Sequence, residues 1–554
     1  MNIAEAIIKN LENIGVKTVF GGSGQSDAEL LFALDKTDIE VILIRHEQAA
    51  SFMACGYGMF DSDNLGVCFS TAGPGVINMI SGLAVAYSDS LPVLSITPYT
   101  PPEYRGRGDL GETSGYYRTP DSQKMLEATT KKSFILERPE DTCDILEEAI
   151  NLAFAERPGP VNLHVGYNLM KEEVPNYRDI EIVRKPVLAS TDELDEFAKA
   201  LGKELKQDRD VIALLGYGCV RSGAEAELKD LLETYQIPFV TTMDGKGVLS
   251  EGHPLALGTI GVSGDQGAKK AFKDAEAVLA VGNSFAKWSA WKFAEGLFAD
   301  KNLFHINIAE KELGKNYQPD YALQSDAKPA VEELLKRLSK EDIEVRDNKE
   351  LPQDRYYNRE INYQGDLIHP GELVLEISHN LPEDSIILGD AGGHMLWLHS
   401  YLNLTKGQNY HNPGSFGPMA FSVNGALGIK KACPERPVIV GCGDGGYQMS
   451  GFEFMTAVEN EIPVIWIIFN NGEFNVIKMF HLRFKETEVY NHFANPDFSE
   501  YAKVCGGRGY KIRKLADFAP AFKEALAAGE PAIIDVKVDP DVYPPFYLYD
   551  EEEE

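Results

Sequence analysis

The segment 443–471 begins with a Gly-Asp-Gly turn and ends with an Asn-Asn pair. A carboxylate such as that of Asp444 and an amide oxygen such as that of Asn471 are the ligands that Mg²⁺ prefers and normally shares with phosphate groups. The amides of Gly445 and Gly446 can hold phosphate oxygens, because free N–H groups at the start of a helix attract anions. This spacing of residue types predicts a clamp for Mg²⁺ and a diphosphate.

The elements around this clamp must bring its two ends together. The run 437–442 is apolar and β-branched, which predicts a buried strand that ends just before the turn. The pattern of 451–459 predicts a helix, and 463–469 reads as a second apolar strand. The right-handed crossover of such a βαβ unit brings both strand ends to one edge of the sheet. We therefore expect Asp444 and Asn471 to point into one crevice.

This stretch resembles the thiamine-diphosphate-binding motif of the thiamine-diphosphate-dependent enzymes, in particular the large catalytic subunits of the acetolactate synthase-like group. The resemblance rests on the turn beginning at Gly443, the doubled asparagine and the strand–helix–strand order. It implies that Asp444, Asn471 and the main-chain carbonyl of Glu473 coordinate Mg²⁺. It also implies an α/β fold of three consecutive parallel-sheet domains, which are pyrimidine-binding, central and diphosphate-binding.

A second segment, RHEQAASFMACGYG at 45–58, supplies a carboxylate for the cofactor's pyrimidine ring. Glu47 follows the apolar run 41–44 and opens a helix of small residues, so we expect its carboxyl at a strand-to-helix junction in apolar surroundings. Such surroundings favour the protonated carboxyl and keep a shared proton available. By the resemblance, Glu47 hydrogen-bonds the pyrimidine N1′ and thereby promotes loss of the C2 proton of the thiazolium ring.

Two more loops are predicted to contact the cofactor. In 412–428, the resemblance implies that Met419 holds the two cofactor rings in a V shape and that the Gly417 carbonyl bonds the pyrimidine edge. A thioether suits this place because it packs well against aromatic faces. The segment 389–397 follows an apolar run and contains paired glycines, which is typical of a phosphate-contacting loop. Its predicted contacts are Gly392, Gly393 and His394, of which the histidine either touches phosphate or caps the following helix.

The segment 73–96 repeats the order of the clamp, with a glycine turn, a helix of small residues and a Pro-Val strand. It lacks the aspartate and the asparagine pair. Two copies of one α/β unit agree with a pyrimidine-binding and a diphosphate-binding domain, and Gly73 and Asn78 are predicted cofactor contacts of the first copy. In the family, the first domain of one subunit and the last domain of another form the active site. We therefore expect a homodimer or homotetramer with sites between subunits.

The length of 554 residues predicts three or four domains. Charge and proline replace apolar periodicity at 171–190 and 341–364, so these segments read as linkers. We expect domains at 1–180, 190–342 and 365–545. Apolar runs alternate with helical stretches between the linkers, which indicates a parallel sheet in the central domain as well. The resemblance leaves open whether this domain binds FAD, ADP or nothing.

Composition limits the partners and the compartment. With 53 basic and 85 acidic residues and a formal charge of −32, the chain is a poor partner for nucleic acid or an anionic membrane. The seven cysteines form no CxxC pair, which favours a reducing cytoplasm. The first residues predict an amphipathic helix rather than a signal peptide, and no apolar run is long enough to span a bilayer. We expect a cytoplasmic protein with a small-molecule substrate.

The positions that would face the substrate differ from those of acetolactate synthases. The tryptophan that this group carries after the asparagine pair is replaced by Phe480, and its FAD-contacting arginine segment is here 282–291. Its Phe-Gln-Glu motif has no clear counterpart in 113–126, where a glutamine or Tyr117 could serve. The candidate catalytic contacts are Gln25, Gln123 and His481. The first could instead be a turn residue, and the last a surface histidine.

The resemblance implies a thiamine-diphosphate-dependent C–C bond lyase or ligase that acts on a 2-oxo acid through an enamine intermediate. Acetolactate synthase-like carboligation, a transferase reaction, is the favoured prediction. A simple 2-oxo acid decarboxylase that releases an aldehyde is the alternative. A hypothesis of another class is an inactive homologue that serves as a binding or regulatory subunit. The presence of Glu47, Asp444 and Asn471 together argues against it.

Overall fold

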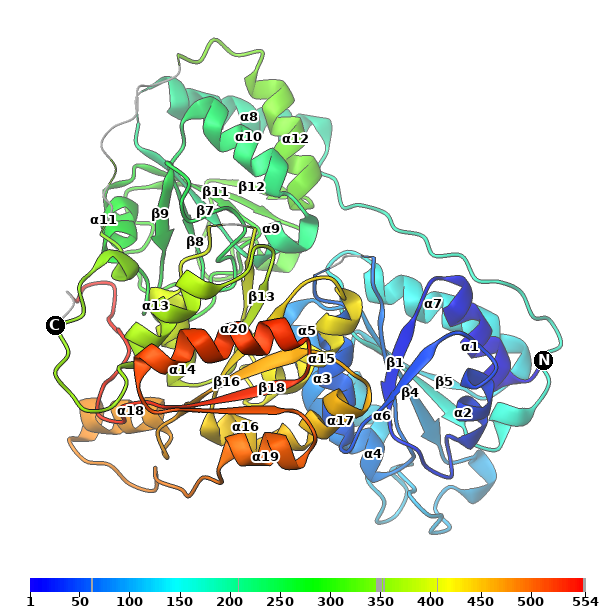
Figure 1. Ribbon diagram of the computed structural model, residues 1–554. Coiled ribbons are helices and arrows are strands. Elements are labelled where there is room, and N and C mark those ends of the chain that lie inside the picture. The colour runs from blue at the N-terminus through cyan, green and yellow to red at the C-terminus, as the bar shows by residue number, and fades with distance from the viewer. Residues whose placement is uncertain (61–62, 208, 345–350, 352–353, 406, 552–554) are drawn as a thin grey trace.

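The computed structural model of the protein describes all but a few short stretches of the chain, namely residues 1–60, 63–207, 209–344, 351, 354–405 and 407–551. These residues form three six-stranded sheets, one after another along the chain. Figure 1 shows them as a first body in blue and cyan, a middle body in green, and a last body from yellow to red. The predicted α/β fold of three consecutive parallel-sheet domains is confirmed.

The first sheet is parallel throughout, with the strand order β2-β1-β3-β4-β6-β5. Its strands are β1 (Thr18–Gly21), β2 (Glu40–Leu43), β3 (Gly66–Phe69), β4 (Val93–Tyr99), β5 (Lys132–Leu136) and β6 (Val161–Gly166). Its helices are α1 (Ile3–Asn13), α2 (Ala28–Leu34), α3 (Glu47–Tyr57), α4 (Pro74–Asn78), α5 (Ile80–Asp89), α6 (Ser122–Glu127) and α7 (Thr142–Phe154). Residues of β3 contribute to two hydrophobic clusters, one on each face, so the sheet is buried between helices.

The middle sheet is also parallel, with the order β9-β8-β7-β10-β11-β12. Its strands are β7 (Val211–Leu215), β8 (Phe239–Thr241), β9 (Ala256–Thr259), β10 (Ala277–Val281), β11 (Asn302–Asn307) and β12 (Tyr321–Gln324). Its helices are α8 (Thr191–Lys206), α9 (Tyr217–Ser222), α10 (Glu225–Tyr235), α11 (Gln266–Asp274) and α12 (Ala327–Leu338). The order places the first and fourth strands side by side, as in doubly wound dinucleotide-binding sheets.

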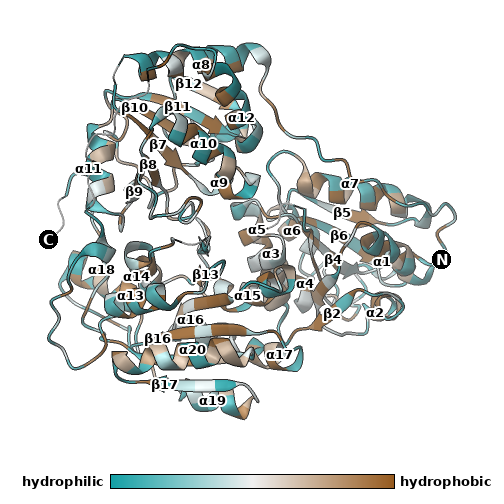
Figure 2. Cartoon of the chain, turned by 45° about the horizontal axis from the view of Figure 1, so that its top comes forward, coloured by the Kyte–Doolittle hydropathy of each residue, from teal (hydrophilic) through white to brown (hydrophobic). Residues whose placement is uncertain are grey.

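The last sheet has the order β14-β13-β15-β16-β18-β17, which repeats the first sheet strand for strand and confirms the predicted internal repeat. Its strands are β13 (Ile386–Gly389), β14 (Asn409–His411), β15 (Val438–Gly443), β16 (Val464–Asn470), β17 (Arg508–Ile512) and β18 (Ala532–Lys537). Its helices are α13 (Pro370–Asn380), α14 (Gly393–Tyr401), α15 (Phe421–Ala432), α16 (Asp444–Ser450), α17 (Phe454–Glu459), α18 (Asn475–Lys485), α19 (Phe498–Val504) and α20 (Phe518–Ala528). In Figure 2 the apolar colour gathers on strands such as β7 and β16, as expected of sheets covered on both faces.

One predicted boundary in this domain is wrong. The helical stretch after β15 begins at Asp444, not at residue 451, and runs through α16 and a short 3₁₀ turn, Gly451–Glu453, into α17. The apolar periodicity that marks a helix starts only at 451. An aspartate in the first turn, however, stabilises a helix start through its negative charge. The clamp residue is thus part of a helix rather than of a free turn.

The first and last domains meet through α3 and α15. A Cβ atom on Gly56 would collide with the carbonyl oxygen of Gly425, and one on Gly428 would collide with that of Met53. The two helices therefore approach backbone to backbone, which only glycine permits. Residues of both domains share one hydrophobic cluster around this contact. The relative placement of the two domains depends on these glycines.

The connections between the domains differ in how far they are described. Residues 172–189 contain no helix or strand and run along the outside of the molecule from the first to the middle domain (Figure 1). The second predicted linker, 341–364, lies partly outside the described residues.

Over the part of the chain that the structure describes, no helix combines the length and the apolar character needed to cross a membrane.

We predict that Gly428→Ala destabilises the protein, because the new methyl group has no space against the backbone of α3. Overpacking of this kind costs about 2 kcal/mol or more of unfolding free energy. Gly296→Ala is the matched control, since a Cβ there meets nothing within 4 Å. Urea denaturation of both variants provides the measurement. Equal stability of the two variants would show that the helix contact is not needed.

Candidate active site

A cavity of about 510 Å³ lies at the carboxyl edge of the last sheet. Its walls come from the loops after β13, β15 and β16, from 412–419, and from Met243 and 286–289 of the middle domain. The chain leaves β13 and β15 in opposite directions, since β14 and β16 lie on opposite sides of that pair. Ligands of open α/β sheets bind at such a switch point. The cavity is therefore the candidate active site.

Asp444 and Asn471 meet at the floor of this cavity. The Asp444 Oδ2 atom accepts hydrogen bonds from the main-chain N–H of Asn471 at 3.0 Å and of Gly472 at 2.6 Å. The Nδ2 atom of Asn495 donates to the same oxygen at 2.6 Å, and the N–H of Gly445 donates to Oδ1 at 2.9 Å. Burial raises the pKa of the Asp444 carboxyl, although these donors oppose the shift. Four donors thus fix one carboxylate at the ends of two neighbouring strands.

The residues around Asp444 fit a diphosphate with its metal ion. Its carboxylate and the Asn471 amide oxygen are the oxygen ligands that Mg²⁺ takes. His394 lines the cavity, and its buried Nε2 atom has no hydrogen-bond partner among the described residues. Buried polar atoms are rarely left unpaired, so a phosphate oxygen suits this position. The alternative role predicted for His394, a cap of the helix that follows, finds no support, because no side chain caps α14 at Gly392.

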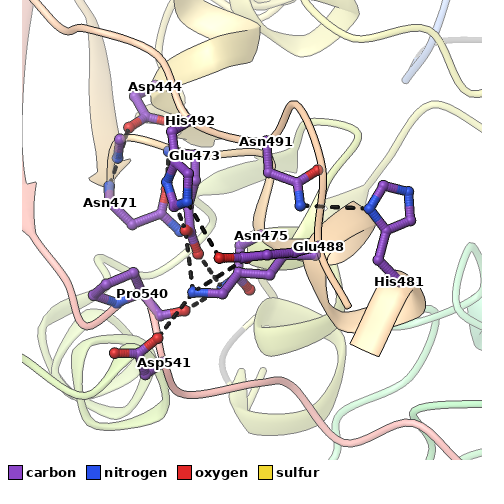
Figure 3. A network of polar contacts seen from close by, with 12 residues as sticks. Asp444, Asn471, Glu473, Asn475, His481, Glu488, Asn491, His492, Pro540 and Asp541 are labelled. Atoms are coloured by element: carbon purple, nitrogen blue, oxygen red, sulfur yellow. Dashed lines mark hydrogen bonds and ion pairs between the residues drawn. The ribbon is translucent and has the colours of Figure 1, made fainter. Parts of the chain in front are cut away.

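The loop after Asn471 is held by a network of charged groups around the buried Glu473 carboxylate (Figure 3). The Glu473 carboxylate lies 3.2 Å from Lys478 Nζ and 3.3 Å from His492 Nδ1. Lys478 in turn lies 2.8 Å from an Asp541 oxygen. The backbone of Glu473 also pairs with that of His492. The predicted metal ligand, the Glu473 carbonyl, therefore sits in a loop with little freedom to move.

The loop that carries Gly417 and Met419 also lines the cavity. The Asp390 carboxylate fixes its end by accepting hydrogen bonds from the N–H of Ala420 at 2.8 Å and of Ser422 at 3.1 Å. Burial raises the pKa of Asp390 to about 7. One acidic residue after β13 thus fixes the end of the loop that carries both predicted ring contacts.

Glu47 begins α3, three residues after β2 ends, as the sequence predicted. Its Oε2 atom accepts a hydrogen bond from Asn78 Nδ2 at 3.0 Å. The side chain is half-buried, so the expected apolar pocket would need a further surface. Just before it, the N–H groups of Arg45 and His46 donate to Glu453 Oε1 at 2.9 and 3.0 Å. The start of α3 is therefore fixed on the last domain.

This attachment keeps Glu47 away from the clamp of its own chain. Asp444 is the first residue of α16, whereas Glu453 lies beyond the other end of that helix. A helix of seven residues is about 10 Å long. The cavity is lined by residues of the middle and last domains, and Glu47 is not among them. A single chain thus presents the two parts of the expected site on different surfaces.

The remaining predicted residues lie outside this cavity and stay predictions. Gly73 precedes α4 with a φ of +78°, and Gln25 is exposed in the loop after β1. The Gln123 amide donates to Glu127 and to the main chain of Ser133. His481 contacts Asn491 at 3.5 Å, as Figure 3 shows. Phe480, which stands in place of the family tryptophan, does line the cavity.

Sequence reasoning missed four acidic or amide side chains that organise the site. They are Asp89, Asp390, Glu453 and Asn495. Two had a signal, because Asp390 comes one residue after the apolar run 386–388 and Glu453 stands between two phenylalanines. The other two had none, since their residue types are ordinary at a helix end and in a loop.

Comparison with families of known proteins gives one match in each part of the chain. Residues 1–124 match the thiamine pyrophosphate enzyme, N-terminal TPP binding domain, where TPP is thiamine diphosphate. Residues 198–334 match the central domain and 390–536 the C-terminal TPP binding domain of the same family. The matches follow the order of the three sheets.

Individual relatives resemble the chain over nearly its whole length. The chain is 32% identical to the probable acetolactate synthase large subunit of Methanocaldococcus jannaschii, over 98% of this chain and 92% of that protein. It is 27% identical to the acetolactate synthase large subunit of Corynebacterium glutamicum, over 98% of this chain and 87% of that protein. The acetolactate synthase isozyme 2 large subunit of Escherichia coli is 27% identical, over 97% and 96%. The similarity therefore includes all three domains.

We predict a pH signature for Asp89, which accepts a hydrogen bond from the N–H of Gly414 at 3.1 Å and so ties the first domain to the cavity loop. Burial raises its pKa from 3.8 to about 6. The folded state therefore holds the proton more tightly, and the stabilisation is complete below about pH 4 and lost as the pH rises through about 6.

Asp89→Asn cannot ionise, so its stability relative to the wild type should improve between pH 4 and pH 7. Thermal unfolding of both proteins across this range measures the difference. Asp38→Asn, at an exposed position of the same domain, serves as the control and should show a constant difference. A relative stability of Asp89→Asn that stays flat or falls would contradict the assignment.

Proposed function

We propose an acetolactate synthase-like function for this chain, which belongs to the thiamine pyrophosphate enzyme family. It binds thiamine diphosphate, as the family's two TPP binding domains indicate. One observation carries the assignment of the site: the Asp444 carboxylate and Asn471 meet in a cavity whose other walls offer glycine loops and an unpaired His394 atom.

Different residues of the chain have different roles in the proposed site. We infer that Asp444, Asn471 and the Glu473 carbonyl would hold Mg²⁺, which would offset the charge of the diphosphate. Thiamine diphosphate, when bound, supplies the electron sink that lets a 2-oxo acid lose CO₂. Met419 packs against the cofactor rings, and Glu47 shares a proton with the pyrimidine N1′.

The phosphate contacts form a second group. They are Gly392, Gly393, His394, Gly443, Gly445 and Gly446, all of which line the cavity. Burial lowers the pKa of His394 to about 4, so its ring is neutral and one nitrogen can donate to a phosphate oxygen. The Gly73 turn and Asn78 support the pyrimidine side through Asn78's hydrogen bond to Glu47.

Carboligation is favoured over simple decarboxylation because the relatives named above are acetolactate synthases or probable ones over almost their full length. The two reactions differ in their products. Incubation with pyruvate and Mg²⁺-loaded cofactor should give acetolactate, and mass spectrometry distinguishes it from acetaldehyde. Acetaldehyde as the only product would indicate a simple decarboxylase instead.

The middle domain offers a second cavity, of about 350 Å³, at the carboxyl ends of β7 and β10. Gly216 and Gly282 lie so close there that a Cβ atom on the former would collide with the latter's carbonyl oxygen. Arg157 and Arg221 also line it. The switch point of a doubly wound sheet and nearby basic groups suit FAD or ADP. The visible absorbance spectrum of the purified protein distinguishes bound FAD from bound ADP and from an empty site.

We also propose domain limits of 1–180, 190–342 and 365–545, since the strands of each sheet lie within them. Sites between subunits of a homodimer or homotetramer are supported by the separation of Glu47 from its own clamp. None of the seven cysteines, all of which lie in the described residues, forms a disulfide, which supports the expected cytoplasmic location.

We predict that Asp444→Ala abolishes metal-dependent cofactor binding, because the diphosphate would lose the cation that offsets its charge. Calorimetric titration with thiamine diphosphate, with and without Mg²⁺, measures the loss. Asp517→Ala, which removes an exposed carboxylate of the same domain, is the control and should bind as the wild type does. Full cofactor affinity in Asp444→Ala would remove the basis of the metal assignment.

A complementation experiment tests the shared site. Glu47→Gln and Asp444→Ala chains should each be nearly inactive alone. Mixed dimers regain one intact site, because one chain supplies Glu47 and the other supplies the clamp. Random mixing should restore about a quarter of the wild-type activity, since half of the dimers are mixed and each has one good site of two. Purified mixed dimers without activity would mean that each chain builds its own site.

A further inference from the structure

The charge at the wall of the active-site cavity is strongly unbalanced. The acidic side chains at its wall are Asp244, Asp444, Glu473 and Asp539, of which Asp244 is only partly ionised near neutral pH because burial raises its pKa to about 7. The basic side chains there are Lys287 and His394, and burial lowers the pKa of His394 to about 4, so that it is neutral. Among the described residues, Lys287 is therefore the one cationic side chain that lines the cavity.

Lys287 is also available to a ligand. It is exposed and forms no ion pair or side-chain hydrogen bond with the part of the chain that the structure describes. Three of the cavity carboxylates already have partners. Glu473 pairs with Lys478, Asp539 accepts a hydrogen bond from Tyr363, and Asp444 accepts the four hydrogen bonds described above. Lys287 is thus available to bind a ligand, whereas most of the carboxylates around it already have partners.

The loop that carries Lys287 is held firmly in place. Phe285 and Trp291, which flank it, are 3% and 2% exposed. The carbonyl of Trp288 accepts a hydrogen bond from the N–H of Val262 at 3.0 Å. Phe285 and Trp291 have φ values of +49° and +44°, which bulky residues rarely adopt. Such strain persists only where the surroundings impose it, and it gathers at functional sites.

The neighbours of Lys287 suit a small organic anion. Trp288, which follows Lys287 in the chain, and Phe480 line the same cavity and give it apolar, aromatic surface. The ring of Phe546 packs edge-on against both of them, with centroids 6.4 and 5.2 Å away. A molecule with a carboxylate at one end and a short apolar group at the other would find both kinds of contact here.

We propose that Lys287 binds the carboxylate of the 2-oxo acid substrate. The inference rests on the proposed function and adds the residue that recognises the substrate's charge. A carboxylate that enters beside other carboxylates and a diphosphate is repelled unless a cation offsets that charge. An ammonium group gives a charge-assisted hydrogen bond to such an oxygen. The predicted phosphate contacts lie at the starts of α14 and α16 in the last domain, whereas Lys287 belongs to the middle domain.

The test compares two unreactive ligands of similar shape, the anion oxamate and the neutral oxamide, by calorimetry on protein loaded with thiamine diphosphate and Mg²⁺. The wild type should prefer oxamate. Lys287→Gln should bind oxamate about tenfold more weakly and oxamide unchanged, because one charged hydrogen bond is lost. Lys287→Arg should keep the preference. Lys270→Gln, at an exposed position on α11, is the matched control and should behave as the wild type.

Three results would overturn the proposal. They are equal oxamate affinity in Lys287→Gln and the wild type, an equal loss for both ligands, and a wild type without preference for the anion. A parallel titration with thiamine diphosphate should give the same affinity in every variant, and a loss confined to Lys287→Gln would assign the lysine to the cofactor instead.

Turnover separates this inference from the proposed function. With a 2-oxo acid substrate, Lys287→Gln should raise KM about tenfold without lowering kcat, since the lost contact is to the bound substrate's carboxylate and gives no extra stabilisation in the transition state, where that carboxylate loses its charge as CO₂. A wild type that prefers oxamate but converts no 2-oxo acid would overturn the proposed function and leave the anion site standing.

Discussion

The structure depends on one buried carboxylate, that of Asp444. It gathers hydrogen bonds from the main chain after β16, from its own helix and from Asn495, which comes from a later loop. A buried carboxylate is costly unless donors or a cation satisfy it. The donors here fix the ends of two strands and a distant loop around one point. Any ligand that brings a cation to this point meets a preformed site.

Carboxylates that accept main-chain N–H groups also join the domains. Glu453 holds the residues before Glu47, and Asp89 holds the loop before Met419, in both cases by accepting main-chain N–H groups across a domain boundary. Together with the glycine contact between α3 and α15, these bonds make the first and last domains one packed unit. That unit keeps Glu47 and Asp444 of one chain at opposite ends of a helix, which supports the proposal of a site shared between subunits.

Charge explains the chemistry that the cavity can accept. The chain carries a formal charge of −32, and the cavity wall is acidic as well. Anionic ligands are therefore admitted only where a cation or oriented N–H groups offset that field. In the proposed site, the N–H groups of the glycine segments and a Mg²⁺ ion held by Asp444 and Asn471 would do so at the phosphate end. Lys287 on the middle domain is placed to do so at the other end, which gives that domain a part in substrate recognition.

The sequence by itself determined the fold class and the centre of the site. Apolar β-branched runs alternating with helical stretches predict buried parallel strands without any knowledge of partners. The fixed hand of a βαβ crossover decides which strand ends meet, so Asp444 and Asn471 could be placed together in advance. The start of α16 was misplaced, because its first residues are glycine-rich and show no apolar period.

Only the tertiary structure decided which side chains hold this centre in place. The bonds of Glu453 to Arg45 and of Asp89 to Gly414 join residues hundreds of positions apart, and a residue type does not encode a distant partner. Lys287 is an ordinary lysine in the sequence, and its importance arises because its loop folds against another domain's cavity. Periodicity and local spacing are properties of one segment, whereas the wall of a cavity is made by several segments that only folding brings together.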